Sequence, residues 1–219
     1  MEEAGAVKAV FEDLGGYGAL SRQGHSADGP LVGHLQRTNI QLAAIAVFAA
    51  KGLEDSTVND VLEAAKVSRR TFYKYFSSKM DVLEGIYQTA VSLLLARFAE
   101  MQALAGSPQA WLQAMVARFF DYHLAVGPII RLMQEEALRA GSPLSVHRQL
   151  AHQEMARLLA ERLESDARST DVLMYRAVIW ALESASLELL ATEAKREQID
   201  NAKRVLSDLA IATLCQRST

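Results

Sequence analysis

Cysteine, proline and glycine are all scarce in this chain. Its single cysteine, Cys215, excludes an intramolecular disulfide and fits a reducing compartment. The 4 prolines and 12 glycines in 219 residues are few for a β-rich fold, which needs many tight turns. Alanine, leucine, glutamate and arginine dominate instead, and all four favour helices. We therefore expect an all-α fold.

Membrane-spanning and secretion signals are also missing from the sequence. No window of about 18 uncharged apolar residues occurs, which predicts neither a membrane span nor a membrane partner. The chain starts with the acidic Glu2 and Glu3, unlike the basic and then apolar start of a signal peptide. A cytoplasmic location is the simplest expectation.

The usual signatures of catalysis and metal binding are absent as well. The sequence has no His-Glu-x-x-His motif, no phosphate-binding Gly-Lys-Ser/Thr loop and no serine elbow. His147 and His152 are five residues apart, a spacing that places them poorly for sharing a metal on one helical face. We expect a protein that is not an enzyme and that has neither a cofactor nor a metal.

A net charge of −3 conceals an uneven distribution. Residues 37–80 hold 7 cations and 4 acids, whereas residues 1–36 hold 2 and 5 and residues 81–219 hold 14 and 17. Local charge matters more than total charge for association with phosphate. The one basic segment is therefore a candidate nucleic-acid surface.

Hydrophobic periodicity predicts about nine main helices and no strand. The glycine-rich residues 1–36 are expected to form a flexible arm. Gly52 is expected to end the first main helix in a left-handed conformation, and Ser-Pro or Gly-Pro pairs separate several later helices. The expected helices are about 38–51, 57–65, 68–76, 78–105, 108–126, 128–140, 143–164, 171–193 and 197–214.

The second and third of these helices form a short pair joined by a tight turn. Val61 and Ala65 lie on the inner face of one, and Ser68 is placed to cap the other. Phe72 and Phe76, four residues apart, point inward together. Cations, hydroxyls and a phenol are left on the outer side of the third helix, namely Arg69, Arg70, Thr71, Tyr73 and Lys74.

That outer side suits the major groove of DNA. Arginines near the helix start can donate to guanine O6 and N7, and the tyrosines and lysines can meet backbone oxygens. Helix N-terminal amides beside Thr57 can add a phosphate site. The predicted DNA-binding residues are Thr57, Ser68, Arg69, Arg70, Thr71, Tyr73, Lys74, Tyr75 and Lys79.

The block from Arg37 to about Tyr87 resembles the DNA-binding domain of the TetR family of bacterial transcriptional regulators. The resemblance covers about a quarter of the chain. It lies in Phe48-Ala-Ala-Lys-Gly52, Thr57-Val-Asn-Asp-Val, Ala64-Ala-Lys-Val-Ser68, Thr71-Phe-Tyr-Lys-Tyr-Phe76 and Ser78-Lys79.

This resemblance implies roles for particular residues. Tyr73 and Lys79 would hold phosphates, and Phe76 would belong to the core. Tyr75 replaces a common histidine, and Lys66 stands where the family typically has glycine in the turn, so that lysine must either adopt a left-handed backbone or change the turn.

After the arm at 1–36, the resemblance implies two regions: a helix-turn-helix domain at 37–87 and an effector-binding and dimerisation bundle at 88–219. A homodimer would place two recognition helices about 34 Å apart on a palindromic operator of double-stranded DNA. The expected function is a transcriptional regulator, most often a repressor in this family, that a small apolar or amphipathic effector releases.

The C-terminal half offers candidates for the effector pocket and the dimer contact. Large apolar side chains and a few polar groups suit a small-ligand site, and these are Trp111, Met115, Phe119, Tyr122, His123, Met133, Tyr175 and Trp180. The last two helices carry small and apolar residues that suit a contact across a two-fold axis. Two alternatives remain: a helical ligand-binding or protein-interaction module without DNA binding, which Lys66 favours, and an α-helical enzyme.

Overall fold

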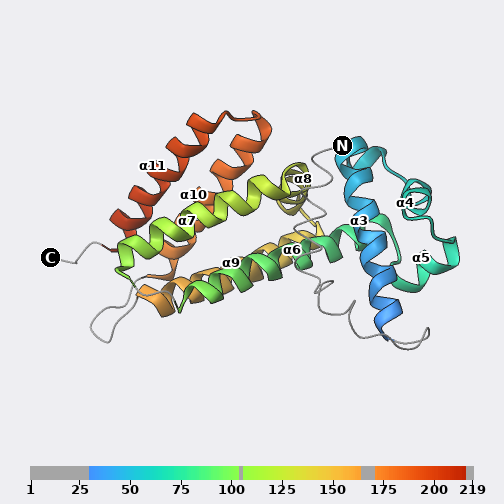
Figure 1. Cartoon of the computed structure of the whole chain (residues 1–219), viewed down its shortest axis with the longest axis horizontal. Helices are drawn as coiled ribbons and strands as arrows, with labels where there is room; N and C mark the ends of the chain where they lie inside the picture. The colour runs from blue at the N-terminus through green and yellow to red at the C-terminus, as the bar shows by residue number, and fades with distance from the viewer. Residues whose placement is uncertain (1–29, 104–105, 164–170, 216–219) are drawn as a thin grey trace. The chain divides into compact units, whose positions relative to one another are not determined.

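Nine helices make up the computed structural model of the chain, with no strand in residues 30–103, 106–163 and 171–215, which the structure describes (Figure 1). The all-α class and the number of main helices are confirmed for those residues. The first helix begins earlier than predicted, at Pro30, so residues 30–36 are helical rather than part of an arm. The remainder of the predicted arm lies outside the described residues.

Two compact units divide the chain. The first contains residues up to Ala90 together with Ala125–Glu136, and the second contains Val91–Leu124 and the residues from Ala137 onward. The predicted boundary at residue 87 falls close to the first of these divisions. The assignment of 125–136 to the first unit was not predicted, because helical periodicity carries no information about which unit buries a helix.

The first unit holds α3 (Pro30–Asp55), α4 (Val58–Ala65), α5 (Arg69–Tyr75), the start of α6 (Lys79–Met101) and α8 (Pro128–Ala137). Helix α3 packs against α4, and both lie beside the short α5 in Figure 1. The predicted stripe on α3 is buried at Ile40, Ala44 and Phe48. Gly52 has φ 75° and ψ 168°, a backbone conformation open essentially only to glycine, so it interrupts α3 as expected but not in the left-handed helical form.

The turn between α4 and α5 settles the question that Lys66 raised. Lys66 adopts the left-handed conformation, with φ 54° and ψ 43°, and its N–H donates to the carbonyls of Leu62 and Glu63. Asn39 Nδ2 donates to the Ala65 carbonyl at 2.9 Å and ties this turn to α3. A lysine thus occupies the glycine position without changing the turn.

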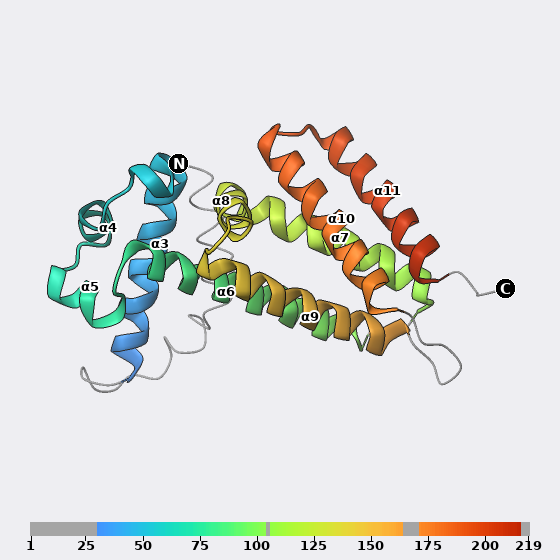
Figure 2. The ribbon, with the colours of Figure 1, turned by 180° about the vertical axis from the view of Figure 1, so that it is seen from behind.

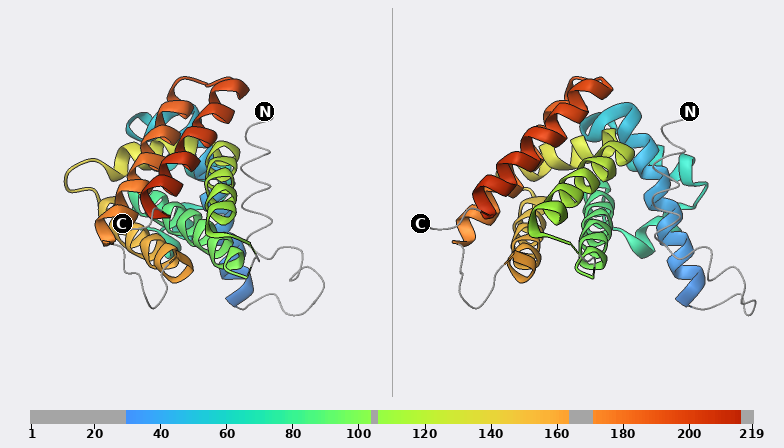
Figure 3. Two further views of the ribbon diagram at one scale, coloured as in Figure 1. Left: turned by 90° about the vertical axis from the view of Figure 1, so that its left-hand side faces the viewer. Right: turned by 60° about the vertical axis from the view of Figure 1, so that its left-hand side comes forward.

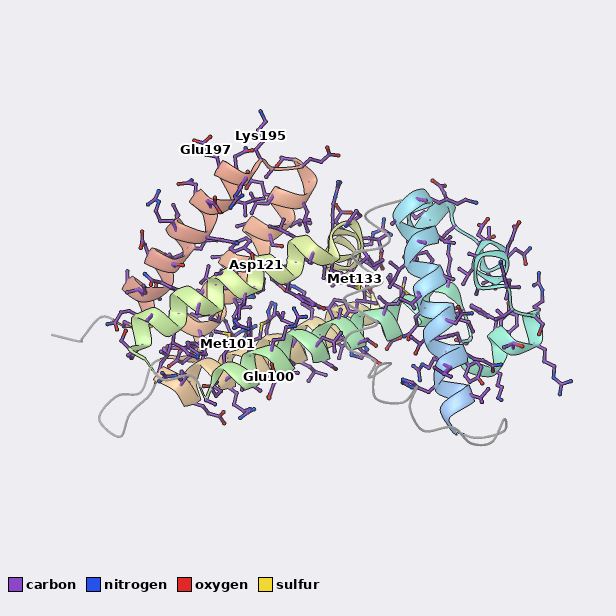
Figure 4. The ribbon with its side chains drawn as sticks, viewed as in Figure 1. Glu100, Met101, Asp121, Met133, Lys195 and Glu197 are labelled. Atoms are coloured by element: carbon purple, nitrogen blue, oxygen red, sulfur yellow. The ribbon has the colours of Figure 1, made fainter. Side chains whose placement is uncertain are left out.

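The second unit is a helical bundle. It contains the end of α6, α7 (Pro108–Val126), α9 (Pro143–Leu163), α10 (Val172–Ala191) and α11 (Arg196–Leu214). Helices α10 and α11 lie side by side as a hairpin, and α10 also packs against α9 (Figures 2 and 3). At the hairpin's connection Lys195 and Glu197 project outward, while Met101 at the end of α6 is buried (Figure 4).

Helix α6 contributes residues to both units. Among the described helices it alone is long and apolar enough to cross a membrane, although core helices commonly pass the same test. Several of its apolar side chains are buried in the fold, including Val82, Leu83 and Ile86 in the first unit and Leu94 and Phe98 in the second. In all, 44% of its apolar window is buried.

The left-handed backbone of Lys66 generates a stability prediction. Such a conformation strains any residue with a Cβ, so Lys66→Gly should raise the free energy of unfolding by about 0.5–1 kcal/mol in urea denaturation. Lys66→Ala keeps the strain and should give no such gain. An equal gain in both variants would mean that the lysine charge, rather than the backbone, is responsible.

Candidate nucleic-acid interface and ligand pocket

Helix α5 presents one exposed side. Arg69, Arg70, Tyr73 and Lys74 are exposed, and 51% of the Tyr73 surface is open to solvent. Within the part of the chain that the structure describes, no hydrogen bond or ion pair engages Arg70 or the Tyr73 hydroxyl. Lys74 Nζ lies 5.3 Å from the centre of the Tyr75 ring. These side chains are available to a partner.

The opposite side of α5 is buried. Phe72 and Phe76 are 0% and 2% exposed, and their ring centres lie 6.0 Å apart. The rings of Phe72 and Tyr73 are nearly perpendicular, with their centres 5.3 Å apart. The inward direction of both phenylalanines is confirmed, and it sets which side of α5 faces out.

Two predicted DNA-binding residues form contacts inside the first unit. Arg69 Nη2 donates to Asn59 Oδ1 on α4, which joins the start of α5 to its neighbour. The Tyr75 hydroxyl donates to Gln36 Oε1 on α3 at 2.8 Å. Arg69 keeps further N–H donors for DNA, but Tyr75 has committed its only donor.

The predicted hydroxyl contacts serve as helix caps. The Thr57 backbone N–H donates to Asp60 Oδ2 at 2.8 Å, and Asp60 N donates back to Thr57 Oγ1, which forms a capping box on α4. Hydrogen bonds from Lys51 and Thr57 lower the pKa of Asp60 to about 2, so the cap stays ionised near neutral pH. Ser68 Oγ accepts from Thr71 N and lies 2.9 Å from Thr71 Oγ1. One hydroxyl proton of that second pair remains for a phosphate.

Lys79 has an internal role that the sequence did not predict. Its ammonium donates to the carbonyls of Leu53, Glu54 and Ser56 at 2.6, 3.0 and 2.7 Å. These carbonyls end α3 and lead into α4, so Lys79 joins the start of α6 to that connection. Since an ammonium has three N–H donors, all of them are engaged here.

The second unit contains an apolar pocket between α6, α7, α9 and α10. It has room for about one water. The pocket is thus nearly closed, and a ligand would have to push side chains apart. Its lining residues are Phe98, Trp111, Met115, Phe119, Met155, Leu158, Leu159, Ile179 and Leu182.

Three of the eight predicted effector residues line this pocket, namely Trp111, Met115 and Phe119. Six further lining residues were missed. Five of these lie on α9 and α10, where the spacing of apolar residues along each helix, Met155 and Leu158 included, was the available signal.

The other predicted effector residues lie elsewhere. Trp180 is 38% exposed, because α10 turns its neighbours Ile179 and Leu182 toward the pocket instead. Met133 lies on α8 in the first unit (Figure 4). Tyr122 and Tyr175 are buried but are not among the lining residues. Burial raises the pKa of Tyr122, so its hydroxyl stays protonated.

His123 is a buried polar residue next to the pocket. Its ring centre lies 3.9 Å from that of Phe119, and its Nδ1 lies 2.7 Å from Ser186 Oγ. Burial lowers its pKa from 6.5 to about 4, although the charge of Glu183 acts the other way. His123 is therefore neutral near neutral pH. Among the described residues, no group of three or more His, Cys, Asp and Glu side chains could hold a metal ion.

The α4–turn–α5 geometry defines a helix-turn-helix protein, and comparison with known proteins specifies the family. The family model for bacterial regulatory proteins of the tetR family matches residues 40–86, which include α4, the turn and α5. The transcriptional repressor KstR2 of Rhodococcus jostii (strain RHA1) is 27% identical over 101 residues, 46% of this chain and 50% of that protein. Residues 40–86 therefore carry the DNA-binding region of the TetR family of bacterial regulators.

Solved structures share the fold over most of the chain. The fatty acid degradation regulator FadR of Bacillus halodurans has a TM-score of 0.69 and 20% identity, covering 88% of this chain and 100% of its own. FadR of Bacillus subtilis, solved in complex with stearoyl-CoA, has a TM-score of 0.68 and 19% identity, covering 79% and 97%. At such identities these structures show the fold alone. The chain spans about half the length of the curated relatives it matches.

A substitution at Lys79 can distinguish a structural role of this residue from a contact with DNA phosphate. Lys79→Met leaves carbonyls without donors and should lower the free energy of unfolding by about 1–3 kcal/mol. If Lys79 only positions the helices, DNA affinity falls but its dependence on salt keeps the same slope. Lys74→Met, the matched variant, should reduce that slope by about one. If Lys79→Met reduced the slope of the salt dependence by the same amount, the result would support the phosphate contact that the sequence predicted for Lys79.

The buried neutral His123 predicts a pH effect. The unfolded chain binds a proton at this residue below about pH 6.5 and the folded chain only near pH 4, so stability is lost as the pH falls between these values. The free energy of unfolding should fall by up to about 1.4 kcal/mol per pH unit more in the wild type than in His123→Gln. Parallel curves for the two proteins would show that His123 does not titrate in this way.

Proposed function

We propose that the protein is a DNA-binding transcriptional regulator that acts in the cytoplasm as a homodimer. The observation that carries the proposal is the exposed side of α5, where Arg70, Tyr73 and Lys74 face away from the buried Phe72 and Phe76. Guanidinium, phenol and ammonium groups on the exposed side of one helix complement the base edges and phosphates of a major groove.

The internal contacts refine the predicted set of DNA-binding residues. Arg70, Tyr73 and Lys74 make the direct contacts, because their polar ends have no competing hydrogen bond among the described residues. Arg69 can contribute through the donors that Asn59 does not use. Tyr75 and Lys79 hold α5 and α6 in place. The caps at Thr57 and Ser68 position the helix N-termini.

Dimerisation is supported by an exposed apolar face on the α10–α11 hairpin. Leu173 and Trp180 on α10, and Val205 and Leu209 on α11, are between 38% and 55% exposed. Ala177 and Ala212 lie on the same faces and are also exposed. On each helix these residues are three or four positions apart and so share one face. Two copies related by a two-fold axis can bury these faces against each other.

Repression released by an effector is the mode of regulation that we favour. KstR2 is a repressor by name, and one structural neighbour was solved with stearoyl-CoA. In this chain the apolar pocket of the second unit is the candidate effector site, and Phe98 of α6 lines it. A ligand that favours one spacing of the two recognition helices would shift the population of conformers. Such coupling of about 1–3 kcal/mol changes operator affinity about 5- to 150-fold.

The alternative of a module without DNA binding loses its main support. It depended on Lys66 in the turn, and Lys66 takes the left-handed backbone that the turn requires. Regulators are also not catalysts by class, so the family gives no reason to expect enzymatic turnover.

Binding to a DNA fragment from beside the protein's own gene tests the proposal. Arg70→Ala should relax base preference at one position by about 1–3 kcal/mol, and Tyr73→Phe should weaken binding to all sequences. Fluorescence anisotropy across a salt series measures both effects. The control is Arg118→Ala, which removes an exposed arginine of the second unit. Unchanged binding in both α5 variants would refute the assignment of this surface to DNA.

A further inference from the structure

A partly buried polar cluster lies in the second unit. It contains His123 from α7, Arg148 and His152 from α9, and Glu183 and Ser186 from α10. Arg148 Nε and Nη2 donate to Glu183 Oε2 at 3.0 and 2.6 Å. His152 Nε2 lies 2.8 Å from the other carboxylate oxygen of Glu183, and His123 pairs with Ser186.

This cluster lies one helical turn from the apolar pocket. His123 follows Phe119 by four residues, Ser186 follows Leu182 by four, and His152 precedes Met155 by three; Phe119, Leu182 and Met155 all line the pocket. Residues three or four apart share one face of a helix. Helices α9 and α10 follow one another in the chain and run in opposite directions (Figure 2). A residue that precedes Met155 on α9 and a residue that follows Leu182 on α10 therefore lie toward the same end of the pocket. The cluster therefore lies next to one end of the pocket.

The permanent charges in the cluster cancel. Burial acts to raise the pKa of Glu183, but the nearby His152 and Arg148 outweigh it and hold the pKa below its ordinary value. Glu183 is thus ionised and paired with Arg148. A carboxylate or phosphate entering this end would meet the Glu183 carboxylate in a poorly solvated site, where repulsion between like charges is strong.

One buried nitrogen in the cluster has the Glu183 carboxylate as its neighbour. His152 is 2% exposed, and its Nε2 lies 2.8 Å from Glu183 Oε1, although the direction of this contact departs from that of a well-aligned hydrogen bond. Buried polar atoms are nearly always satisfied by protein or by another molecule. The hydroxyl of Ser186 and the second nitrogen of His123 add further hydrogen-bonding capacity beside it.

We propose that the pocket selects a neutral amphipathic effector: a hydrocarbon body in the apolar part and an uncharged hydroxyl or carbonyl group at the His152–His123–Ser186 end. This inference rests on the proposed ligand-responsive function and specifies the chemical class of the ligand. Glu183 excludes anions because its carboxylate repels them and because it occupies Arg148, the cation that could otherwise bind them.

The test uses 1-decanol, 2-decanone, decanoate and decylammonium as matched probes at pH 7.5. The chain has 2 tryptophans, so the Trp180→Phe variant leaves Trp111, which lines the pocket, as the fluorescent reporter. We expect 1-decanol and 2-decanone to bind at least tenfold more tightly than decanoate. His152→Phe should weaken binding of the two neutral probes about tenfold and leave decanoate unchanged.

Glu183→Gln provides the decisive variant. Removing the carboxylate frees Arg148, so decanoate should gain at least tenfold in affinity and the preference for neutral probes should disappear. Ser184→Ala, on the exposed side of α10, is the matched control and should change nothing. If Glu183→Gln does not fold, as judged by circular dichroism, the order of the four probes on the wild-type pocket decides alone.

Three outcomes would overturn the proposal: tighter binding of decanoate than of 1-decanol, a preference that survives in Glu183→Gln, or no binding of any probe. Each leaves DNA binding untouched, because the fluorescence of Trp111 reports the pocket without an operator. Loss of DNA binding by the α5 variants tests the regulator function separately.

Discussion

The burial of Phe72 and Phe76 is the constraint on which the DNA-binding unit depends. Helix α5 has 7 residues, too few to be stable alone in water, so packing must hold it. Both phenyl rings are almost fully buried, in a core that also contains Ile40, Ala44 and Phe48. Once these two rings are inside, the geometry of a helix directs Arg70, Tyr73 and Lys74 outward.

The polar residues around α5 divide into those that hold the helix and those that remain available. Lys79 binds three carbonyls near the end of α3, and Tyr75 reaches Gln36 on α3. Both carry groups that suit a phosphate, yet their donors already satisfy polar groups of the protein. A residue type that fits DNA is therefore not sufficient evidence of a contact, since the same donor can serve the fold.

The second unit combines an apolar pocket with a charged and hydrogen-bonded end. Burying an ion pair such as Arg148–Glu183 seldom adds stability over a hydrophobic pair of similar volume. Its presence, beside a histidine nitrogen whose contact with Glu183 is poorly aligned, fits a requirement for selectivity. The nearly closed pocket has the same implication, because a ligand must displace side chains on α6, α7, α9 or α10, and that displacement is what a regulator can transmit.

Local pattern in the sequence was enough to predict the helices, the caps at Thr57 and Ser68, and the inward direction of Phe72 and Phe76. Those features depend on residues close together in the chain, through helical periodicity and capping. The start of α3 at Pro30 and the lining of the pocket by Met155 and Ile179, but not by Trp180, depended on packing between distant segments. Only the tertiary structure decided which donors are engaged, as at Lys79 and Tyr75, and which carboxylate meets His152. Partners 23 to 39 residues apart in sequence leave no periodic trace, because their meeting is set by how whole helices pack.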